Sequence, residues 1–498
     1  MLANFRNANR FRASSQSLAA VEDRQSLPKP HHGLLVLPRS IRFPYKEKRE
    51  LGTSRSATEI QFENTSCGQL VPVSSNSPLL SDQNFAASFM GQRLFFSVGE
   101  PSGDLHAANL IRAVQQISPS STFRGLGGSR MIQAGLELDY DLTSLAVMGF
   151  AEVLPKLREF FRVADLAEQS FARGDVDGVV LVDFPGFNWH IARRAKKYGL
   201  PVFYYLPPQL WAWGGWRVKK MRRYVDHVLC NLPFETPWFQ KRNVDAHYVG
   251  HPFFDAVAQQ VLDVRFIEKW RDNKILQVAV LPGSRDHEVH NIWPLQLEVI
   301  RKLAAKHPQT QFLVAAIKDS HALWCRSLLK ASDAKLPIHI FAGKTSEIIE
   351  LSDCSLMKSG SVSLEMMARG KPAAVMYHLS QTTYAMAKLL VKCKRMSLPN
   401  LIADQQVLPE FLSHGKLNSK SALRSIEDVT QEMSRLLGDS EYRMTQRRNL
   451  NALASQFAKP GASNAAARFI MAKLITSDEG TLPMDGDNMG QADYRRVA

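Results

Sequence analysis

The chain has 498 residues, of which 45% are hydrophobic and 22% charged, and it carries a formal net charge of +15. This composition excludes a wholly disordered chain, a collagen and a disulfide-rich mini-protein, and the length predicts about two to four domains. No apolar run reaches the ~18 residues that a membrane-spanning helix needs. The five scattered cysteines form no C-x-x-C pair, which favours a reducing compartment. The basic balance indicates a nucleic acid, an anionic membrane surface or a phosphorylated substrate as partner.

Residues 1–90 form a distinct segment, in which no helical or strand period persists and 11 Lys and Arg stand against 7 Asp and Glu. The first 20 residues contain Arg6, Arg10 and Arg12 and no acidic residue. An acid-free start rich in Arg and Ser is typical of an organellar transit peptide. The spacing of the arginines favours the mitochondrion, with the chloroplast as the alternative. A disordered tail without an address is the other interpretation left open.

From Arg93 onward, short apolar runs alternate with helical periods. Continuous apolar runs indicate parallel strands covered on both faces, and strand–helix alternation indicates an α/β, doubly wound sheet. The first series of predicted strands is Leu94–Val98, Gly178–Asp183, Val202–Leu206 and His227–Leu232, with helices at Gly103–Val114 and Asn188–Tyr198.

A second series of the same kind follows a charged helix near Asp263–Asn273. Its strands are Val278–Leu281, Thr310–Ala315, Ile338–Phe341, Ser355–Met357 and Ala373–Met376, with helices at Glu288–Lys306 and Ser361–Arg369. The sequence therefore predicts two consecutive α/β domains, followed by helices and a loose tail. Their bounds are 91–265, 266–420, 421–476 and 477–498.

Doubly wound sheets bind ligands at the carboxyl ends of their strands, so the residues just after each strand are the candidates for chemistry. Glu100 lies in the segment GEPSGD after the first strand, where a solvated structural acid gains little. Ser102 or Asp104 in the same segment can simply cap the helix. Asp183 ends a buried strand ahead of a Pro-Gly turn and is well placed as a general base, although a turn or N-cap aspartate fits equally well.

Three tryptophans, Trp211, Trp213 and Trp216, are followed closely by basic residues. Such a segment can stack bases and neutralise phosphates, or it can lie at a membrane interface with its cations on anionic lipid. The default interpretation is a core aromatic cluster followed by a solvated amphipathic helix. The basic residues are Arg217, Lys219, Lys220, Arg222 and Arg223.

Two Gly/Ser turns in the second domain lie where a strand gives way to a helix, and both suit a phosphate. They are Gly283-Ser284-Arg285 and Ser359-Gly360-Ser361. Glu365, one turn into the second helix, can accept both hydroxyls of a ribose while the turn holds a diphosphate. The H-E-x-H spacing of His287, Glu288 and His290 does not place two histidines one helical turn apart, which argues against a metal site.

Taken together, these motifs resemble the lipid-A-disaccharide synthase family from about Leu94 to about Leu412. So many ordered motifs at matching separations make a chance similarity untenable. The segments that carry the resemblance are GEPSGD at Gly99–Asp104, LAVMGFAEVL at Leu145–Leu154, VDFPGFN at Val182–Asn188, WAW at Trp211–Trp213, PFE at Pro233–Glu235, VGHP at Val249–Pro252, LPGSR at Leu281–Arg285, SGSVSLE at Ser359–Glu365 and SLPNL at Ser397–Leu401.

The resemblance implies a GT-B fold, in which two Rossmann-like domains face each other, and a hexosyltransferase that needs neither metal nor other cofactor. The implied reaction moves a 2,3-diacylglucosamine unit from its UDP donor to 2,3-diacylglucosamine 1-phosphate (lipid X), with inversion, to give a β-1,6 disaccharide in lipid A biosynthesis. It also implies peripheral association with an anionic membrane surface. Carried over by position, the base falls on Asp183, a second important acid on Glu100, and the donor-site residues on Arg285, Glu365 and Asn400.

Two features depart from the family pattern. The family commonly carries a second acid three residues after Asp183, where this chain has Gly186. Residues 1–90 have no bacterial counterpart, which suggests an organellar member from a plant. No nucleic acid is expected as a partner, and a homodimer is left open.

The alternatives that remain are another UDP-sugar GT-B enzyme, a UDP-sugar epimerase, and a non-catalytic lipid- or RNA-binding relic that uses the tryptophans. A relic is free to lose its acids and its donor arginine. The joint presence of Glu100, Asp183, Arg285 and Glu365 therefore argues against that last interpretation.

Overall fold

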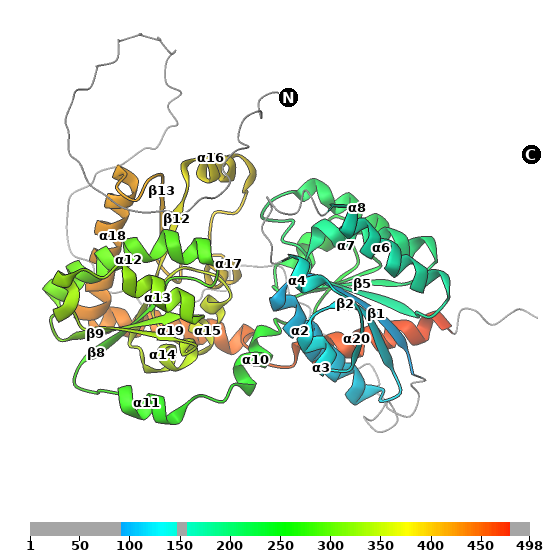
Figure 1. The fold of residues 1–498 in the computed structure, drawn as a ribbon, viewed down its shortest axis with the longest axis horizontal. Coiled ribbons are helices and arrows are strands. Elements are labelled where there is room, and N and C mark those ends of the chain that lie inside the picture. The colour runs from blue at the N-terminus through cyan, green and yellow to red at the C-terminus, as the bar shows by residue number, and fades with distance from the viewer. Residues whose placement is uncertain (1–90, 147–156, 479–498) are drawn as a thin grey trace, which may run out of the picture. The chain divides into compact units, whose positions relative to one another are not determined.

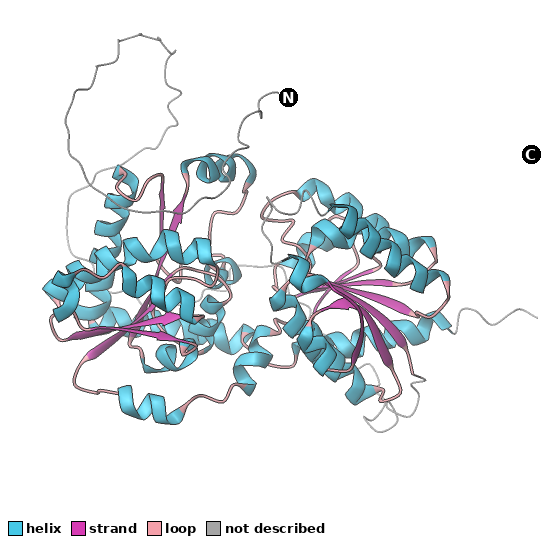
Figure 2. Cartoon of the chain, viewed as in Figure 1, coloured by secondary structure: helices cyan, strands magenta, loops and turns pink. Residues whose placement is uncertain are grey.

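The computed structural model describes residues 91–146 and 157–478, all of which belong to one compact unit, Pro78–Ala498. Two parallel β-sheets follow each other along the chain, and Figures 1 and 2 show helices on both sides of each sheet. Among the described residues, none of the helices combines the length and the apolar character required to cross a bilayer. The α/β, doubly wound prediction is confirmed.

The first sheet has seven parallel strands in the order β3-β2-β1-β4-β5-β6-β7. This is the Rossmann order, in which the chain reverses its direction of winding between β1 and β4. Every residue of β4 is buried, as the continuous apolar run predicts. The strands are β1 (Arg93–Val98), β2 (Thr122–Gly127), β3 (Leu136–Asp141), β4 (Gly178–Val182), β5 (Val202–Tyr205), β6 (His227–Cys230) and β7 (Ala246–Tyr248).

Helices cover both faces of this sheet because successive residues of each strand point to opposite sides. Phe95 of β1 belongs to the core on one face and Phe96 to the core on the other. The helices are α2 (Pro101–Ile117), α3 (Ser129–Gln133), α4 (Leu142–Ala146), α6 (Leu157–Ala172), α7 (Pro185–Lys197), α8 (Val218–Tyr224), α9 (Glu235–Gln240) and α10 (Phe253–Gln259), with a 3-10 turn at Gly215–Arg217.

The second sheet repeats the pattern with six parallel strands in the order β10-β9-β8-β11-β12-β13, so its winding reverses between β8 and β11. Its strands are β8 (Leu276–Leu281), β9 (Thr310–Ala316), β10 (Ile338–Ala342), β11 (Cys354–Met357), β12 (Ala373–Leu379) and β13 (Glu410–His414). Its helices are α11 (Val264–Trp270), α12 (Asp286–Lys306), α13 (Asp319–Ser327), α14 (Thr345–Leu351), α15 (Val362–Ala368), α16 (Gln381–Leu390) and α17 (Leu398–Ala403), with a 3-10 turn at Ala331–Lys335.

The three C-terminal helices divide between the two sheets. Helix α18 (Lys420–Gly438) joins the core of the second sheet, and α19 (Ser440–Phe457) packs on α15. Helix α20 (Ala462–Asp478) packs on α2, and its Ile470 and Met471 lie in the core of the first sheet. Asp255 of α10 holds the start of α20, since its carboxylate accepts hydrogen bonds from the backbone of Ala462 and Ser463.

Each predicted strand coincides with an observed strand, but the prediction missed β2, β3, β7 and β13. These are edge or near-edge strands with less apolar sequences. In β3 only Leu136 is fully buried, and β7 has three residues. The domain boundary near residue 265 stays a prediction, and the segment 1–90 and most of 477–498 lie outside the described residues.

Candidate active site

The two acids predicted from the first domain lie at its switch point. Strands β1 and β4 pair directly, with Val98 beside Val182 in register. Glu100 follows β1 by one residue after Gly99, and Asp183 follows β4 at once. The reversal of winding therefore brings the two acids to one place at the carboxyl edge, where doubly wound sheets bind their ligands.

Asp183 and the next residue adopt a left-handed backbone, with φ of +49° at Asp183 and +40° at Phe184. Such a conformation costs about 1–3 kcal/mol per residue when the residue is not glycine. Buried Asn188 offsets this cost, because its Nδ2 group donates to the carbonyl oxygens of Asp183, Val182 and Ser97 at 2.9–3.2 Å. The Tyr204 hydroxyl donates to the same Asp183 carbonyl at 2.6 Å. These bonds fix the turn that aims the Asp183 side chain.

Glycines of the GEPSGD segment leave room for this turn. A Cβ atom on Gly103 would lie 3.2 Å from Oδ2 of Asp183, and one on Gly99 would lie 2.3 Å from the Phe184 ring. Gly186, where the family commonly has an acid, is exposed, and its Cβ would meet nothing within 4 Å. Packing therefore does not explain the missing acid.

Aromatic rings pack against the residue that follows Asp183. Phe184 contacts Phe187 and Phe160 with ring centroids 6.1 Å apart in each case. Burial raises the pKa of Asp183 to about 7, and the charge of Glu100 adds to the rise. The N-cap residue of α7 is Phe184, so the N-cap interpretation of Asp183 is wrong, and its left-handed backbone belongs to the turn before the helix. A partly buried carboxyl group with a pKa near neutrality suits a general base.

Glu235 of the PFE segment is a useful contrast to Asp183. Burial also raises its pKa to about 7, but the side chain is completely buried and its oxygens are occupied. They accept from Trp211 Nε1 at 2.9 Å and from the backbone of Leu232 at 3.1 Å. Glu235 therefore holds Trp211 and the start of α9, and it has no open face for a substrate.

In the second domain, the two predicted turns also meet at the switch point. Leu281 of β8 pairs with Met357 of β11, and the Lys358 amide donates to the Leu281 carbonyl. The amides of Ser284 and Arg285 do not stand free for a phosphate, however. They donate to Oε2 of Glu288 at 3.0 and 3.3 Å.

This finding corrects the prediction for the Gly283-Ser284-Arg285 turn. Glu288 lies at the third position of α12, from which its carboxylate folds back over the turn as a capping group. Lys358 Nζ binds the other oxygen at 2.6 Å, and although burial opposes ionisation, these bonds hold the pKa of Glu288 at about 2. The cations that face outward here are Lys358 and the exposed Arg285 guanidinium, 3.5 Å from Glu288.

The second turn retains exposed backbone at Gly360 and Ser361, whereas Ser359 is buried. Glu365 is also buried, and Arg369 binds its carboxylate at 3.0 Å. The same guanidinium reaches Glu350 at 3.1 Å. In this structure Glu365 thus belongs to an ion-pair network, and its contact with a ribose stays a prediction.

Asn400, which was predicted to contact the UDP-sugar donor, uses its whole side-chain amide in hydrogen bonds within the protein. Its Nδ2 donates to the Leu408 carbonyl and to Glu410, and its Oδ1 accepts from the amides of Val407 and Leu408, all at 2.7–2.8 Å. An Asn side chain has two donor and two acceptor positions, so none is left for a ligand. The amide fastens the loop before β13, and a direct contact with the donor finds no support in this geometry.

Several structural residues of these motifs were missed by sequence reasoning: Asn188, Tyr204, Glu235, Glu288 as a cap, and Lys358. The expectation for Asp104 was close, because it does cap a helix. Its carboxylate accepts from the amides of Gly128, Arg130 and Met131 and so caps α3 rather than its own helix. The segment 147–156, which holds most of LAVMGFAEVL, lies outside the described residues.

The tryptophan segment is neither wholly core nor wholly surface. Trp211 is partly buried against Glu235, whereas Trp213 and Trp216 are 47% and 67% exposed. The Arg217 guanidinium stacks on Trp213 at 4.2 Å from the ring centroid. Lys219 and Lys220 are exposed on α8. The default interpretation of a core cluster is therefore wrong for Trp213 and Trp216.

Comparison with known proteins gives a consistent result. The profile of the family described as lipid-A-disaccharide synthetase matches residues 94–460. The lipid-A-disaccharide synthase of Anaeromyxobacter dehalogenans strain 2CP-1 is 34% identical over 397 residues, which cover 79% of this chain and 98% of that protein.

Two solved structures share the fold at low sequence identity. A UDP-N-acetylglucosamine 2-epimerase from Listeria monocytogenes, so described provisionally, superposes with a TM-score of 0.54 at 14% identity, over 79% of this chain and 98% of that one. A calicheamicin glycosyltransferase gives a TM-score of 0.50 at 13% identity, over 78% and 100%. Because epimerase and transferase both match, the fold alone does not separate these activities.

Proposed function

The chain belongs to the lipid-A-disaccharide synthase family, and on that premise we propose that it is an inverting hexosyltransferase that joins two acylated glucosamine units. The donor is UDP-2,3-diacylglucosamine and the acceptor is lipid X. The observation that carries the proposal is the position of Asp183 beside Glu100 at the first switch point, with a pKa near neutrality.

The proposed step needs one base and one stabilised leaving group. Ionised Asp183 takes the proton of the acceptor 6-hydroxyl, and the freed oxygen forms a bond to the anomeric carbon of the donor. The bond from that carbon to the diphosphate oxygen breaks, and UDP leaves with the electron pair. Glu100 orients the acceptor or serves as the base itself.

Arg285 and Lys358 supply positive charge for the departing diphosphate in the second domain. Their ammonium and guanidinium groups face the same turn, and cations placed where negative charge develops lower the barrier to transfer. The exposed backbone at Gly360 and Ser361 adds hydrogen-bond donors beside them. A UDP-sugar epimerase is the rival enzyme, because a protein described as one shares this fold.

One assay separates the candidates. The purified full-length chain is supplied with UDP-2,3-diacylglucosamine in the presence and absence of lipid X. A transferase releases UDP together with a disaccharide only when lipid X is present. An epimerase converts the donor sugar without an acceptor, and a relic leaves both compounds unchanged.

We also propose that the protein docks on an anionic lipid surface, since both substrates are acylated. Two exposed apolar sites with adjacent cations support this. One is Trp213 and Trp216 with the basic residues of α8. The other is α16, where Leu389 is 84% exposed just ahead of exposed Lys392 and Lys394.

The sequence also predicts a lipid contact at the apolar face of residues 153–171, which carries Leu154, Leu157, Phe160 and Phe161. In the structure Phe160 packs on Phe184 and Phe187, whereas Phe161 is 49% exposed. Leu154 lies outside the described residues, as does the side chain of Leu157. Of the two described side chains, Phe161 is the one available as an apolar contact for lipid.

Vesicle co-sedimentation tests the docking. Each basic residue near an anionic surface contributes about 1 kcal/mol, so binding is expected to rise with anionic lipid content and fall with salt. Trp216→Ser is expected to weaken binding, and Val264→Ser, at an exposed apolar residue of α11, serves as the matched control. Binding that ignores lipid charge and salt would remove the electrostatic part of the proposal.

Finally, we propose that residues 1–60 direct the protein into an organelle, the mitochondrion first and the chloroplast as the alternative. The acid-free, Arg-bearing start supports an import signal. A fluorescent fusion that lacks residues 1–60 is expected to stay in the cytosol and to keep its activity after purification. Continued entry into an organelle would exclude this assignment.

A further inference from the structure

A cluster of two histidines and one aspartate lies away from the candidate active site. His227 is the first residue of β6, Asp245 directly precedes β7, and His247 lies within β7. Strands β6 and β7 pair with Val228 beside Ala246, so His227 and Asp245 are neighbours across the pair. His227 and Asp245 stand at the amino end of a parallel sheet, whereas Asp183 stands at its carboxyl end.

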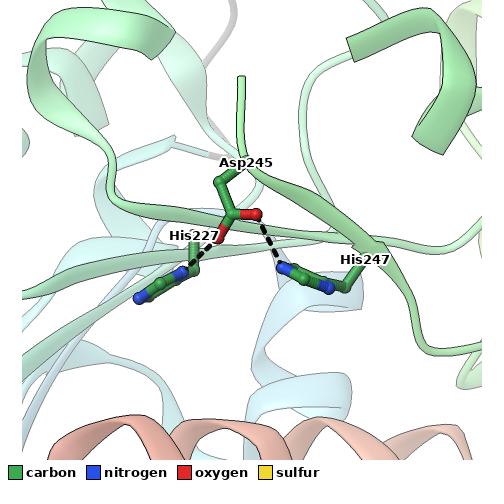
Figure 3. Close-up of side chains that lie close together, drawn as sticks. All are labelled: His227, Asp245 and His247. Atoms are coloured by element: carbon green, nitrogen blue, oxygen red, sulfur yellow. Dashed lines mark hydrogen bonds and ion pairs between the residues drawn. The ribbon is translucent and has the colours of Figure 1, made fainter. Parts of the chain in front are cut away.

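All three side chains converge on one spot (Figure 3). His227 Nδ1 lies 2.5 Å from Asp245 Oδ2, and His247 Nε2 lies 2.8 Å from Asp245 Oδ1. One ligand atom from each residue lies within 4.8 Å of the other two. The side chains are 19%, 48% and 36% exposed for His227, Asp245 and His247, so an ion can reach them from solvent.

From this geometry we propose that His227, Asp245 and His247 form a binding site for a divalent transition metal of the zinc class. Two imidazoles and one carboxylate are a three-ligand set typical of Zn²⁺, with water in the fourth position at bond lengths of about 2.0–2.2 Å. Such bonds place tetrahedral ligands about 3.3 Å apart, so side-chain adjustments within the cluster suffice. Mg²⁺ and Ca²⁺ prefer oxygen ligands and do not suit two imidazoles.

The surroundings connect the cluster to the C-terminal helix. The Phe469 ring of α20 packs on His247 and His227, with centroids 4.3 and 5.5 Å apart, and Phe203 stacks on His227 at 5.2 Å. A bound ion would fix the imidazoles on which α20 rests and thereby stabilise the docking of the C-terminal helix.

Zinc binding to the metal-free full-length chain tests the site. Calorimetric titration with ZnCl₂ is expected to show about one equivalent more for wild type than for His247→Ala or Asp245→Asn. Wild type is also expected to gain thermal stability with Zn²⁺, because a ligand that binds only the folded state stabilises it. His190→Ala, which removes an exposed histidine of α7, is the matched control and should retain the wild-type stoichiometry.

Two results would overturn the site: no zinc binding by wild type, or equal stoichiometry in wild type and both cluster variants. Far-UV circular dichroism and UDP binding show whether the variants are folded. If they are not, Co²⁺ bound to wild type gives the answer. The intense visible bands of four-coordinate Co²⁺ with nitrogen ligands support the site, whereas the weak spectrum of hydrated Co²⁺ contradicts it. A spectrum of hydrated Co²⁺ would mean that the three residues form a hydrogen-bonded cluster and no metal site.

Discussion

The two sheets have the same winding, yet the pKa values of the acids at their switch points are shifted in opposite directions. Burial raises the pKa of Asp183 in the first domain to about 7, and the charge of neighbouring Glu100 adds to the rise. Glu288 in the second domain binds Lys358 and two backbone amides, so its pKa falls to about 2. Position in the fold delivers a carboxylate to the strand ends, but its neighbours decide whether it can exchange a proton near pH 7.

The difference also separates the two tasks of a transferase. A base must gain and lose a proton, and Asp183 is left free to do so. A leaving-group site must keep fixed positive charge, and Glu288 fixes Lys358 and Arg285 around one turn.

The largest expected effect comes from Asp183→Asn, which keeps the shape of the side chain and removes the base. We expect kcat to fall by about 100-fold or more, the usual contribution of a general base. UDP affinity should stay near wild type, because the proposed nucleotide site is in the other domain. UDP release measures the first quantity and calorimetry the second. If Asp183→Asn keeps near-normal turnover and Glu100→Gln is inactive, then Glu100 is the base and Asp183 is not.

The next effect concerns the donor. Arg285→Ala removes an exposed guanidinium and should weaken binding of UDP by about 1.5–3 kcal/mol, the range for a charge-assisted hydrogen bond. Glu365→Ala should raise KM for the donor more than KM for the acceptor, but part of its effect will come from the loss of the Arg369 ion pair. Unchanged UDP affinity in both variants would show that the nucleotide binds elsewhere.

Lys358→Met tests the ion pair that neutralises Glu288. It leaves a buried carboxylate with Arg285, 3.5 Å away and exposed, as its remaining cation, and we expect a loss of about 2 kcal/mol of stability at pH 7, less than for a fully buried pair because Lys358 is partly exposed. The folded-state pKa of Glu288 is depressed, so this stabilisation is present above the unfolded pKa of about 4.3 and is lost as pH falls through about 2. Urea unfolding at pH 7 and pH 3 should show a smaller difference between wild type and variant at pH 3.

The strands next to each switch point were predictable because burial on both faces leaves a continuous apolar run. Edge strands such as β3 and β13 carry polar residues and gave no such signal. The place of Asp183 and Glu100 at the carboxyl edge was predictable because each follows a buried strand of one parallel sheet, while their roles stay predictions. The side-chain contacts of Glu288 and Asn400 were not predictable, because their partners Lys358 and Glu410 come from other segments of the chain. A side chain's free hydrogen-bonding capacity depends on tertiary contacts that a motif does not contain.

The smallest expected effect is the most specific to the proposed site. Burial is the larger cause of the raised pKa of Asp183, and the charge of Glu100 is the smaller. In wild type, kcat should fall as pH drops below about 7, because protonated Asp183 cannot accept the acceptor's proton. Glu100→Gln removes one negative charge, which makes Asp183 easier to ionise. The acidic limb of the curve of kcat against pH should therefore move to lower pH. An ordinary aspartate has a pKa of about 3.9, whereas that of Asp183 is about 7. Because Glu100 causes the smaller part of this rise, its removal should move the acidic limb by less than half of the difference. Measuring kcat at saturating lipid X isolates this shift, since the phosphate of the acceptor titrates identically with both enzymes. A limb that does not move, or that moves to higher pH, would mean that Glu100 does not act on the base through its charge.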